Sequence, residues 1–93
     1  MKTREEIREI GIEYLKLKNR KYSFIHPAEA VRFYEKDEIL FGRRKGEYLD
    51  VFEVSYDFTV VNQERGALIY IDAETGEVLY TLSSHGWVED ALG

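Results

Sequence analysis

The spacing of apolar side chains over the first eighteen residues is helical. Apolar residues recur there at steps of three and four: Ile7, Ile10, Tyr14 and Leu17. This spacing places them on one face of an amphipathic helix over about residues 4–18, with Gly11 and Leu15 flanking the same face. Thr3 followed by Glu6 fits a capping box, in which each side chain accepts a backbone N–H of the first turn. We therefore predict one N-terminal helix whose apolar face needs a partner.

A period of two replaces the helical period from Tyr48 to Val60. The apolar members of this alternation are Phe52, Val54, Tyr56 and Phe58. The intervening members are Val51, Glu53, Ser55 and Asp57. Such alternation predicts a strand with one buried face and one face toward solvent. The predicted core combines helix and sheet side chains: Ile10, Tyr14, Phe52, Val54, Tyr56 and either Ile69 or Tyr70.

The chain after residue 60 predicts two further strands joined by short connections. The predicted elements follow in order: a loop over 62–66, a strand over 67–72, a tight turn over 72–76 and a strand over 78–82. Gly66 is free to take a positive φ in the loop. In the turn, the Asp72 carboxylate can accept backbone N–H groups while Gly76 adopts the left-handed conformation. Sequential strands with short connections predict an antiparallel meander.

The segment 27–41 fits two interpretations. Pro27 followed by Ala-Glu-Ala suits the start of a helix. Apolar residues that alternate with polar ones suit a hairpin instead: Val31, Phe33, Ile39 and Phe41. We favour the hairpin, with a turn at 35–37 and a loop at 42–46 after it. The helix remains the alternative.

Composition supports one folded domain over residues 1–93. Hydrophobic residues make up 44% and aromatic residues 14% of the chain, which excludes a disordered protein. A chain of 93 residues is at the low end of single-domain size. Because the helix face and the strand face each need an apolar partner, we predict an α+β fold with the N-terminal helix packed on a curved antiparallel meander sheet.

Charge and cysteine content narrow the classes of partner. The 13 basic and 18 acidic residues give a net charge of −5, which argues against binding to a nucleic-acid backbone. The absence of Cys excludes disulfides and thiolate zinc sites. The N-terminus lacks the apolar run of a signal peptide, and no apolar stretch is long enough to span a membrane. We therefore expect a cytoplasmic protein that binds neither nucleic acid nor membrane.

No motif in the chain predicts catalysis. The two histidines, His26 and His85, lack metal-site spacing. A catalytic triad could be written from Ser83 or Ser84 with His85 and Asp90. Its geometry is unfavourable, because adjacent side chains of an extended chain point in opposite directions. Glu53 and Asp57, four residues apart, could act as paired carboxylates. We predict no enzyme, no catalytic residue, no cofactor and no metal.

The candidate residues for binding a partner are Glu53, Asp57, His85 and Trp87. The two carboxylates share the polar side of one predicted strand, where the alternative is a solvated sheet face. Trp87 lies outside the periodic core pattern, and Trp is enriched at interaction hot spots. Its alternative role is to close the open end of the sheet. Cationic stretches at 16–21 and 43–45 are solvated or could bind an acidic partner.

The run LIYIDAETGEVL at 68–79 resembles the C-terminal hairpin of PepSY-like domains, in which a D-x-x-T-G-E-V turn recurs. The helix-plus-sheet layout and the chain length are similar to several families of small bacterial immunity proteins, the cytoplasmic antidotes of secreted toxins. The resemblance implies an α+β domain that binds another protein. The missing signal peptide and membrane helix favour the immunity class over an envelope inhibitor of peptidases. Neither family supplies catalytic residues.

Three hypotheses of function follow. The leading one is a non-catalytic protein-binding module, an immunity-type inhibitor that sequesters a toxin, with a basic partner favoured by the acidic chain. The second is a structural or regulatory domain that forms a homodimer through an exposed sheet edge. The third is a small hydrolase that uses Glu53 with Asp57, or His85.

Overall fold

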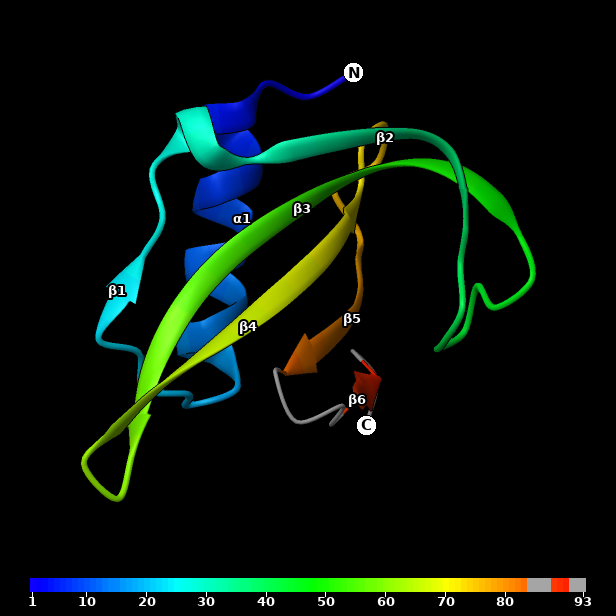
Figure 1. The fold of residues 1–93 in the computed structure, drawn as a ribbon. Helices are drawn as coiled ribbons and strands as arrows, with labels where there is room; N and C mark the ends of the chain where they lie inside the picture. Colours follow the sequence, from blue (N-terminus) through cyan, green and yellow to red (C-terminus); the bar gives the residue numbers. More distant parts are fainter. Residues whose placement is uncertain (84–87, 91–93) are drawn as a thin grey trace.

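The computed structural model describes residues 1–83 and 88–90, and these residues form one α-helix and an antiparallel sheet of short and long strands (Figure 1). The elements in chain order are α1 (Arg4–Leu17), β1 (Phe24–Ile25), a 3₁₀ turn (Ala28–Ala30), β2 (Arg32–Glu38), β3 (Tyr48–Val60), β4 (Gln63–Asp72), β5 (Val78–Ser83) and β6 (Val88–Asp90). The predicted α+β class, with a helix on an open antiparallel sheet, is confirmed.

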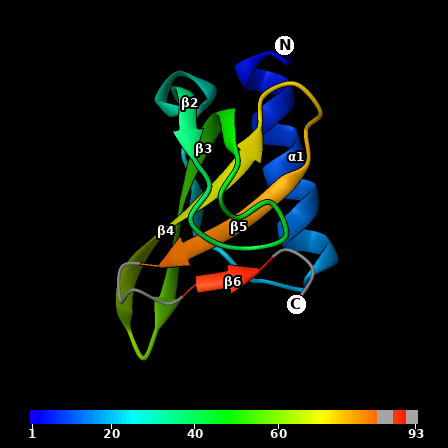
Figure 2. The ribbon, with the colours of Figure 1, turned by 90° about the vertical axis from the view of Figure 1, so that its right-hand side faces the viewer.

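The sheet is a meander in which two strands, β1 and β2, pair with the same edge of β3. Strands β3, β4, β5 and β6 pair with one another in sequence, and all these pairs are antiparallel. The outer edge of β3 is shared, because β1 pairs with its C-terminal half and β2 with its N-terminal half. Six strands of the described chain therefore fill five positions. The strands twist as they cross, and α1 lies against one face only (Figure 2).

Helix α1 begins with the predicted capping box. The Glu6 backbone N–H donates to Thr3 Oγ1 (3.1 Å), and the Thr3 backbone N–H donates to Glu6 Oε1 (2.8 Å). The bond donated by the Thr3 backbone N–H is the largest of the interactions that lower the pKa of the Glu6 carboxyl. The prediction for Leu17 is wrong, because this side chain is 85% exposed. The helix ends there, and Leu15 one turn after Gly11 completes the buried face in its place.

The main core lies between α1 and the sheet. The predicted core residues Tyr14, Phe52, Val54, Tyr56 and Ile69 are buried. Ile10 is partly buried against the same cluster, and of the pair Ile69 or Tyr70 it is Ile69 that faces the helix. A Cβ at Gly11 would lie 3.5 Å from Val54 Cγ1, so this glycine lets α1 approach β3 closely.

The predicted turn at 35–37 is wrong, because β2 runs through these residues as one strand. The chain irregularity is instead a bulge, in which Lys36 takes a positive φ of 50° and donates its backbone N–H to Asp50 Oδ1 (2.9 Å). Pairing with β3 on both sides of the bulge explains why the strand continues. The β2–β3 connection is the loop 39–47, and Pro27 begins only a 3₁₀ turn.

The predicted loop at 62–66 is also wrong, because β3 and β4 extend to Val60 and Gln63. The connection is a two-residue turn, Val61–Asn62, and both residues have positive φ (48° and 62°). Two positive φ values define the type I′ turn, whose twist matches that of the paired strands. Gly66 lies inside β4 opposite Asp57 and does not take a positive φ.

The predicted turn at 72–76 is confirmed. Asp72 Oδ1 accepts backbone N–H groups from Glu74 (2.8 Å) and Thr75 (3.1 Å). Gly76 has a φ of +79°, and a Cβ there would come within 2.9 Å of Ile10 Cδ1. The start of the chain is held against the same turn. The Lys2 backbone N–H donates to the Ala73 carbonyl (2.9 Å), and the N-terminal ammonium lies 3.3 Å from Glu74.

Candidate functional site

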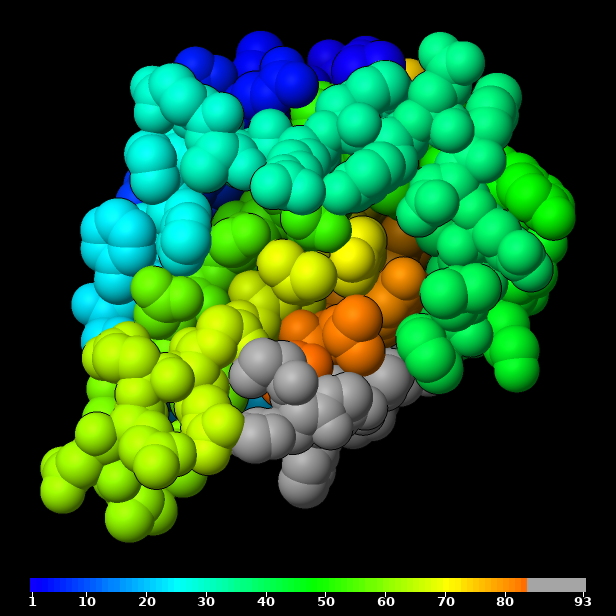
Figure 3. Space-filling model, in the orientation of Figure 1, coloured from blue at the N-terminus to red at the C-terminus, as the bar shows by residue number. Residues whose placement is uncertain are grey.

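The sheet face opposite α1 carries most of the chemically distinctive side chains, and Figure 3 views the molecule from this side. Cross-strand neighbours form two rows on it. One row runs through Glu53, Tyr70 and Tyr80, and the next runs through Ser55, Leu68 and Leu82. The two rows differ in burial.

The first row is a buried polar and aromatic cluster. Glu53 is only 7% exposed, and its Oε2 accepts hydrogen bonds from Tyr70 Oη (2.9 Å) and Tyr34 Oη (3.4 Å). The rings of Tyr70 and Tyr80 stack with their centroids 4.7 Å apart, and Phe41 meets Tyr80 edge-on. Burial, then the bond to Glu53, raises the pKa of Tyr70 above its ordinary value. We call Tyr34, Glu53, Tyr70 and Tyr80 the tyrosine cluster.

The tyrosine cluster corrects the interpretation of Glu53 as a residue on a solvated face. It lies on the predicted side of β3, but the tyrosines and the loop 39–47 cover that half of the strand. Ile39, in this loop, is 1% exposed and packs with Val51 of β3. A buried carboxylate needs hydrogen-bond partners, and the two tyrosines supply them. Glu53 therefore helps to hold three strands together.

The cationic stretch at 43–45, interpreted as solvated or as able to bind an acidic partner, is largely neutralised by ion pairs. Arg43 Nη2 lies 2.6 Å from Glu77 Oε2, and Arg44 Nη1 lies 3.0 Å from Glu77 Oε1. Arg44 also donates to both carboxylate oxygens of Glu47. These bonds clamp the loop 39–47 against the beginning of β5. Of the three cations at 43–45, Lys45 alone has no ion pair among the described residues.

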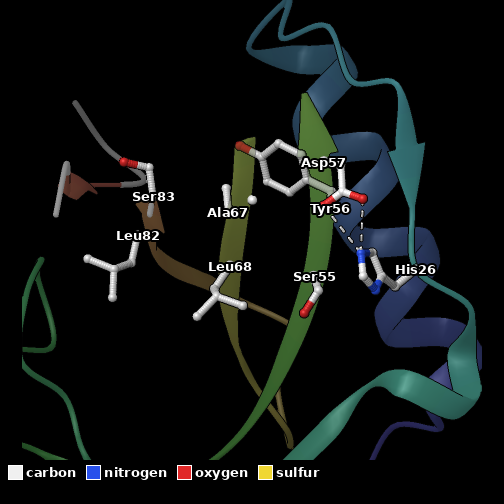
Figure 4. Close-up of a pocket in the computed structure, with 9 residues that line it drawn as sticks. His26, Ser55, Tyr56, Asp57, Ala67, Leu68, Leu82 and Ser83 are labelled. Carbon is white, nitrogen blue, oxygen red and sulfur yellow. Dashed lines mark hydrogen bonds and ion pairs between the residues drawn. The ribbon is translucent and has the colours of Figure 1, made fainter. Parts of the chain in front are cut away.

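The second row borders an open groove. It has a volume of about 300 Å³, and its lining includes His26, Ser55, Asp57, Leu68 and Leu82 (Figure 4). Asp57 lies beside His26, whose Nε2 is 3.4 Å from each carboxylate oxygen, and both side chains are 35% exposed. Leu68 and Leu82 supply apolar surface from β4 and β5. We call this feature the Asp57 groove.

The structure therefore separates the two predicted binding carboxylates. Asp57 is accessible in the groove, whereas Glu53 is enclosed. Four residues along a strand correspond to roughly 13 Å, well beyond the separations of about 5 to 9.5 Å found between the catalytic carboxylates of glycosidases. The strand geometry does not favour Glu53 and Asp57 as a catalytic pair.

Sequence reasoning missed His26 as the partner of Asp57. The two residues are 31 positions apart, and β1 brings them together by pairing with β3. No local pattern signals such a contact, because β1 has only two residues. His85 and Trp87, the other predicted binding residues, lie outside the described residues.

Neither a metal cluster nor a membrane-spanning helix is found among the described residues. Over 1–83 and 88–90, no group of three or more His, Cys, Asp or Glu side chains is placed to hold a metal ion. Within the same residues, no helix combines the length and the apolar character needed to cross a lipid bilayer. Comparison of the chain with protein-family models, with curated proteins and with solved structures gives no match.

Proposed function

We propose that this chain is a non-catalytic protein-binding module, and that it acts as an immunity-type inhibitor which sequesters a toxin in the cytoplasm. The observation that carries the proposal is the Asp57 groove, an open depression with apolar walls and a half-exposed carboxylate on the free face of the sheet. Interfaces between proteins combine an apolar centre with polar groups that fix orientation. The groove offers both within one surface.

The bonding of the ionisable groups also supports a binding role. Glu53 accepts hydrogen bonds from two tyrosines, and Asp57 is paired with His26. A hydrolase needs a nucleophile or water with a base in hydrogen-bond reach and a second group to orient that base. The bonds described for this face serve instead to join strands. The resemblance of the hairpin at 68–79 to PepSY-like domains, and of the helix-plus-sheet layout to immunity proteins, adds to the same proposal.

The chemistry of the chain favours a basic partner. The net charge of −5 attracts a cationic protein over a distance, and Asp57 provides a local acceptor for its Arg or Lys side chains. Leu68 and Leu82 then exclude water from the contact. Long-range attraction of this kind acts chiefly on the association rate, whereas apolar contact acts on dissociation.

To test the proposal, a tagged copy of the chain is expressed in its native host. A protein that remains bound to the tagged copy is then identified and purified. In the purified pair, we expect Asp57→Lys to slow association and to weaken its dependence on salt. We expect Leu68→Asp to speed dissociation. Glu9→Lys is the matched control, because it makes the same change of charge on an exposed residue of α1. Unchanged kinetics in both groove variants would overturn the proposed site.

The Trp87 hypothesis fits into the same experiment. If this side chain anchors the partner, Trp87→Ala is expected to weaken the binding free energy of the purified pair by about 2 kcal/mol or more, mainly through faster dissociation. Thermal unfolding of the variant alone provides the control. If Trp87 closes the sheet, its removal lowers the melting temperature of the variant. Normal binding by a folded Trp87→Ala protein would remove this residue from the interface.

The edge-paired homodimer receives less support. The outer edge of β2 has a bulge at Lys36, and the last four positions of the strand all carry charged side chains: Glu35, Lys36, Asp37 and Glu38. Bulges and charges are the features by which proteins prevent edge strands from pairing. On the other side, β6 spans only three residues.

A further inference from the structure

The hairpin formed by β3 and β4 extends beyond the rest of the sheet. The described pairing of β1 with β3 stops at Asp57, and that of β5 with β4 stops at Ala67. The pairs from Phe58 opposite Arg65 to Val60 opposite Gln63 have no third strand in this described pairing. We call residues 58–65 the arm. It projects from one end of the molecule in Figures 1 and 3.

Element lengths explain why α1 ends short of the arm, which the Ser23 side chain still reaches through its hydrogen bond to Glu64 (3.1 Å). Helix α1 has 14 residues, about 21 Å at 1.5 Å per residue. Strand β3 has 13 residues, about 43 Å at 3.3 Å per residue. The helix therefore covers only about half of the strand, and the apolar face continues past it through Phe58 and Val60. A groove of about 430 Å³, the arm groove, runs beside these two side chains and Thr81.

The apex of the arm is apolar and conformationally unfavourable. Val61 is 88% exposed and Val60 is 44% exposed. Val61 also has a positive φ of 48°, which is an outlier for a β-branched residue. Asn or Gly would suit this position of a type I′ turn better. An exposed valine at a position that disfavours it does not stabilise the isolated fold, which points to a contact outside the chain.

The charge distribution identifies which occupant fits. The arm contains one acidic residue, Glu64, and one basic residue, Arg65, so its net charge is zero. The whole chain has a net charge of −5, and that charge therefore lies entirely outside the arm. Two copies of an acidic chain repel each other over most of their surfaces. The arm has no net charge and its Val60–Val61 apex is apolar, so two copies can meet there without that repulsion.

We infer that two copies of this chain associate through their arms, with the Val60–Val61 apex of each copy seated in the arm groove of the other. A twofold axis makes such a contact self-complementary, because the projecting apex and the groove both belong to the same end of the chain. The contact buries the uncovered face of Phe58 and Val60. Tyr56, Ala67 and Ser83 line both grooves. Phe58 and Val60 nevertheless lie on the α1 side of β3 and Asp57 on the opposite side, so the dimer contact and the contact with Asp57 use opposite faces of the sheet.

Sedimentation equilibrium over about 1 to about 500 µM protein tests the inference. We expect the natural chain to show a concentration-dependent dimer. Val61→Gly should raise the dimer dissociation constant about tenfold or more, because it removes apolar area from the apex. The substitution should not unfold the protein, because Gly adopts the positive φ without strain.

Leu17→Gly is the matched control, because Leu17 is as exposed as Val61 (85%) but lies at the end of α1 outside the arm. It should leave the dissociation constant within about twofold. Its melting temperature is measured alongside, and Leu17→Ala replaces it if the helix end frays. A natural chain that stays monomeric throughout, or a dimer that Val61→Gly does not weaken, would overturn the inference. Both results leave the partner experiment with Asp57→Lys unaffected.

Discussion

The two halves of β3 have the same alternation of side chains but different surroundings. Residues 51–54, in the first half, are all buried, including Glu53. Residues 58–60, in the second half, range from half-buried to exposed. The first half is a middle layer between α1 and the loop 39–47, whereas the second half forms the arm. Alternation thus identifies a strand. Whether a position on that strand contributes to stability or stays exposed depends on the other elements that pack against it.

The largest expected difference between the halves is at their phenylalanines. Phe52→Ala should lower the free energy of unfolding by about 3 to 5 kcal/mol, because Phe52 is 3% exposed and contacts Phe33 and Arg4. Phe58→Ala, the matched change in the second half, should cost less than half of that. Urea denaturation measures both. Equal losses would show that the arm is as well packed as the core.

The carboxylates give the next largest difference. Glu53→Ala should cost about 1 to 3 kcal/mol, because it leaves the part-buried hydroxyls of Tyr70 and Tyr34 without their acceptor. Asp57→Ala should cost less than about 1 kcal/mol, since its pair with His26 is partly exposed. The same denaturation experiment ranks the two. A more costly change at Asp57 would contradict the assignment of Glu53 as the structural carboxylate.

The apex of the arm should respond in the opposite direction. Replacing Val61–Asn62 by Asn-Gly should stabilise the chain by about 1 kcal/mol, because both positions have positive φ and the new pair suits a type I′ turn. Differential scanning calorimetry at low protein concentration checks this without interference from association. Destabilisation would mean that Val61 makes a favourable contact within its own chain.

The smallest effect concerns alkaline pH. The pKa of Tyr70 is raised in the folded state, so at high pH the unfolded chain loses this proton first. The contribution of this raised pKa to the free energy of unfolding is fully present below the ordinary Tyr pKa of about 10. It is lost as the pH rises from there toward the pKa of the folded state. Denaturation between about pH 9 and 11 should show the decline, and Tyr70→Phe should reduce it. An unchanged slope in Tyr70→Phe would place the titration elsewhere.

The sequence predicts those features that depend on neighbouring residues. The capping box of Thr3 and Glu6 joins residues three apart, and the Asp72 turn closes within a few residues. The bounds of β3 follow from its own alternation, and they match the structure from Tyr48 to Val60. Such local features carry their cause within one short segment, so one sequence is enough to find them.

The features that the sequence does not predict depend on distant contacts. Glu53 is buried by tyrosines 17 and 19 positions away, on β4 and β2. Strand β2 continues through the bulge at Lys36, where the polar residues 35–37 predict a turn, because β2 pairs with β3 on both sides of the bulge. Of the candidate site, Asp57 could be selected from its place on β3, but His26 required the fold. His85 and Trp87 stay predictions.

The bonds that hold Met1 and Lys2 to the turn at 72–76 have a practical consequence for fusion proteins. A tag or reporter joined ahead of Met1 removes the ammonium that pairs with Glu74, but it emerges beside that turn. Figure 1 places this point at the opposite end of the molecule from the arm. An N-terminal reporter therefore leaves the arm accessible and is the suitable attachment for fluorescence measurements of both proposed associations.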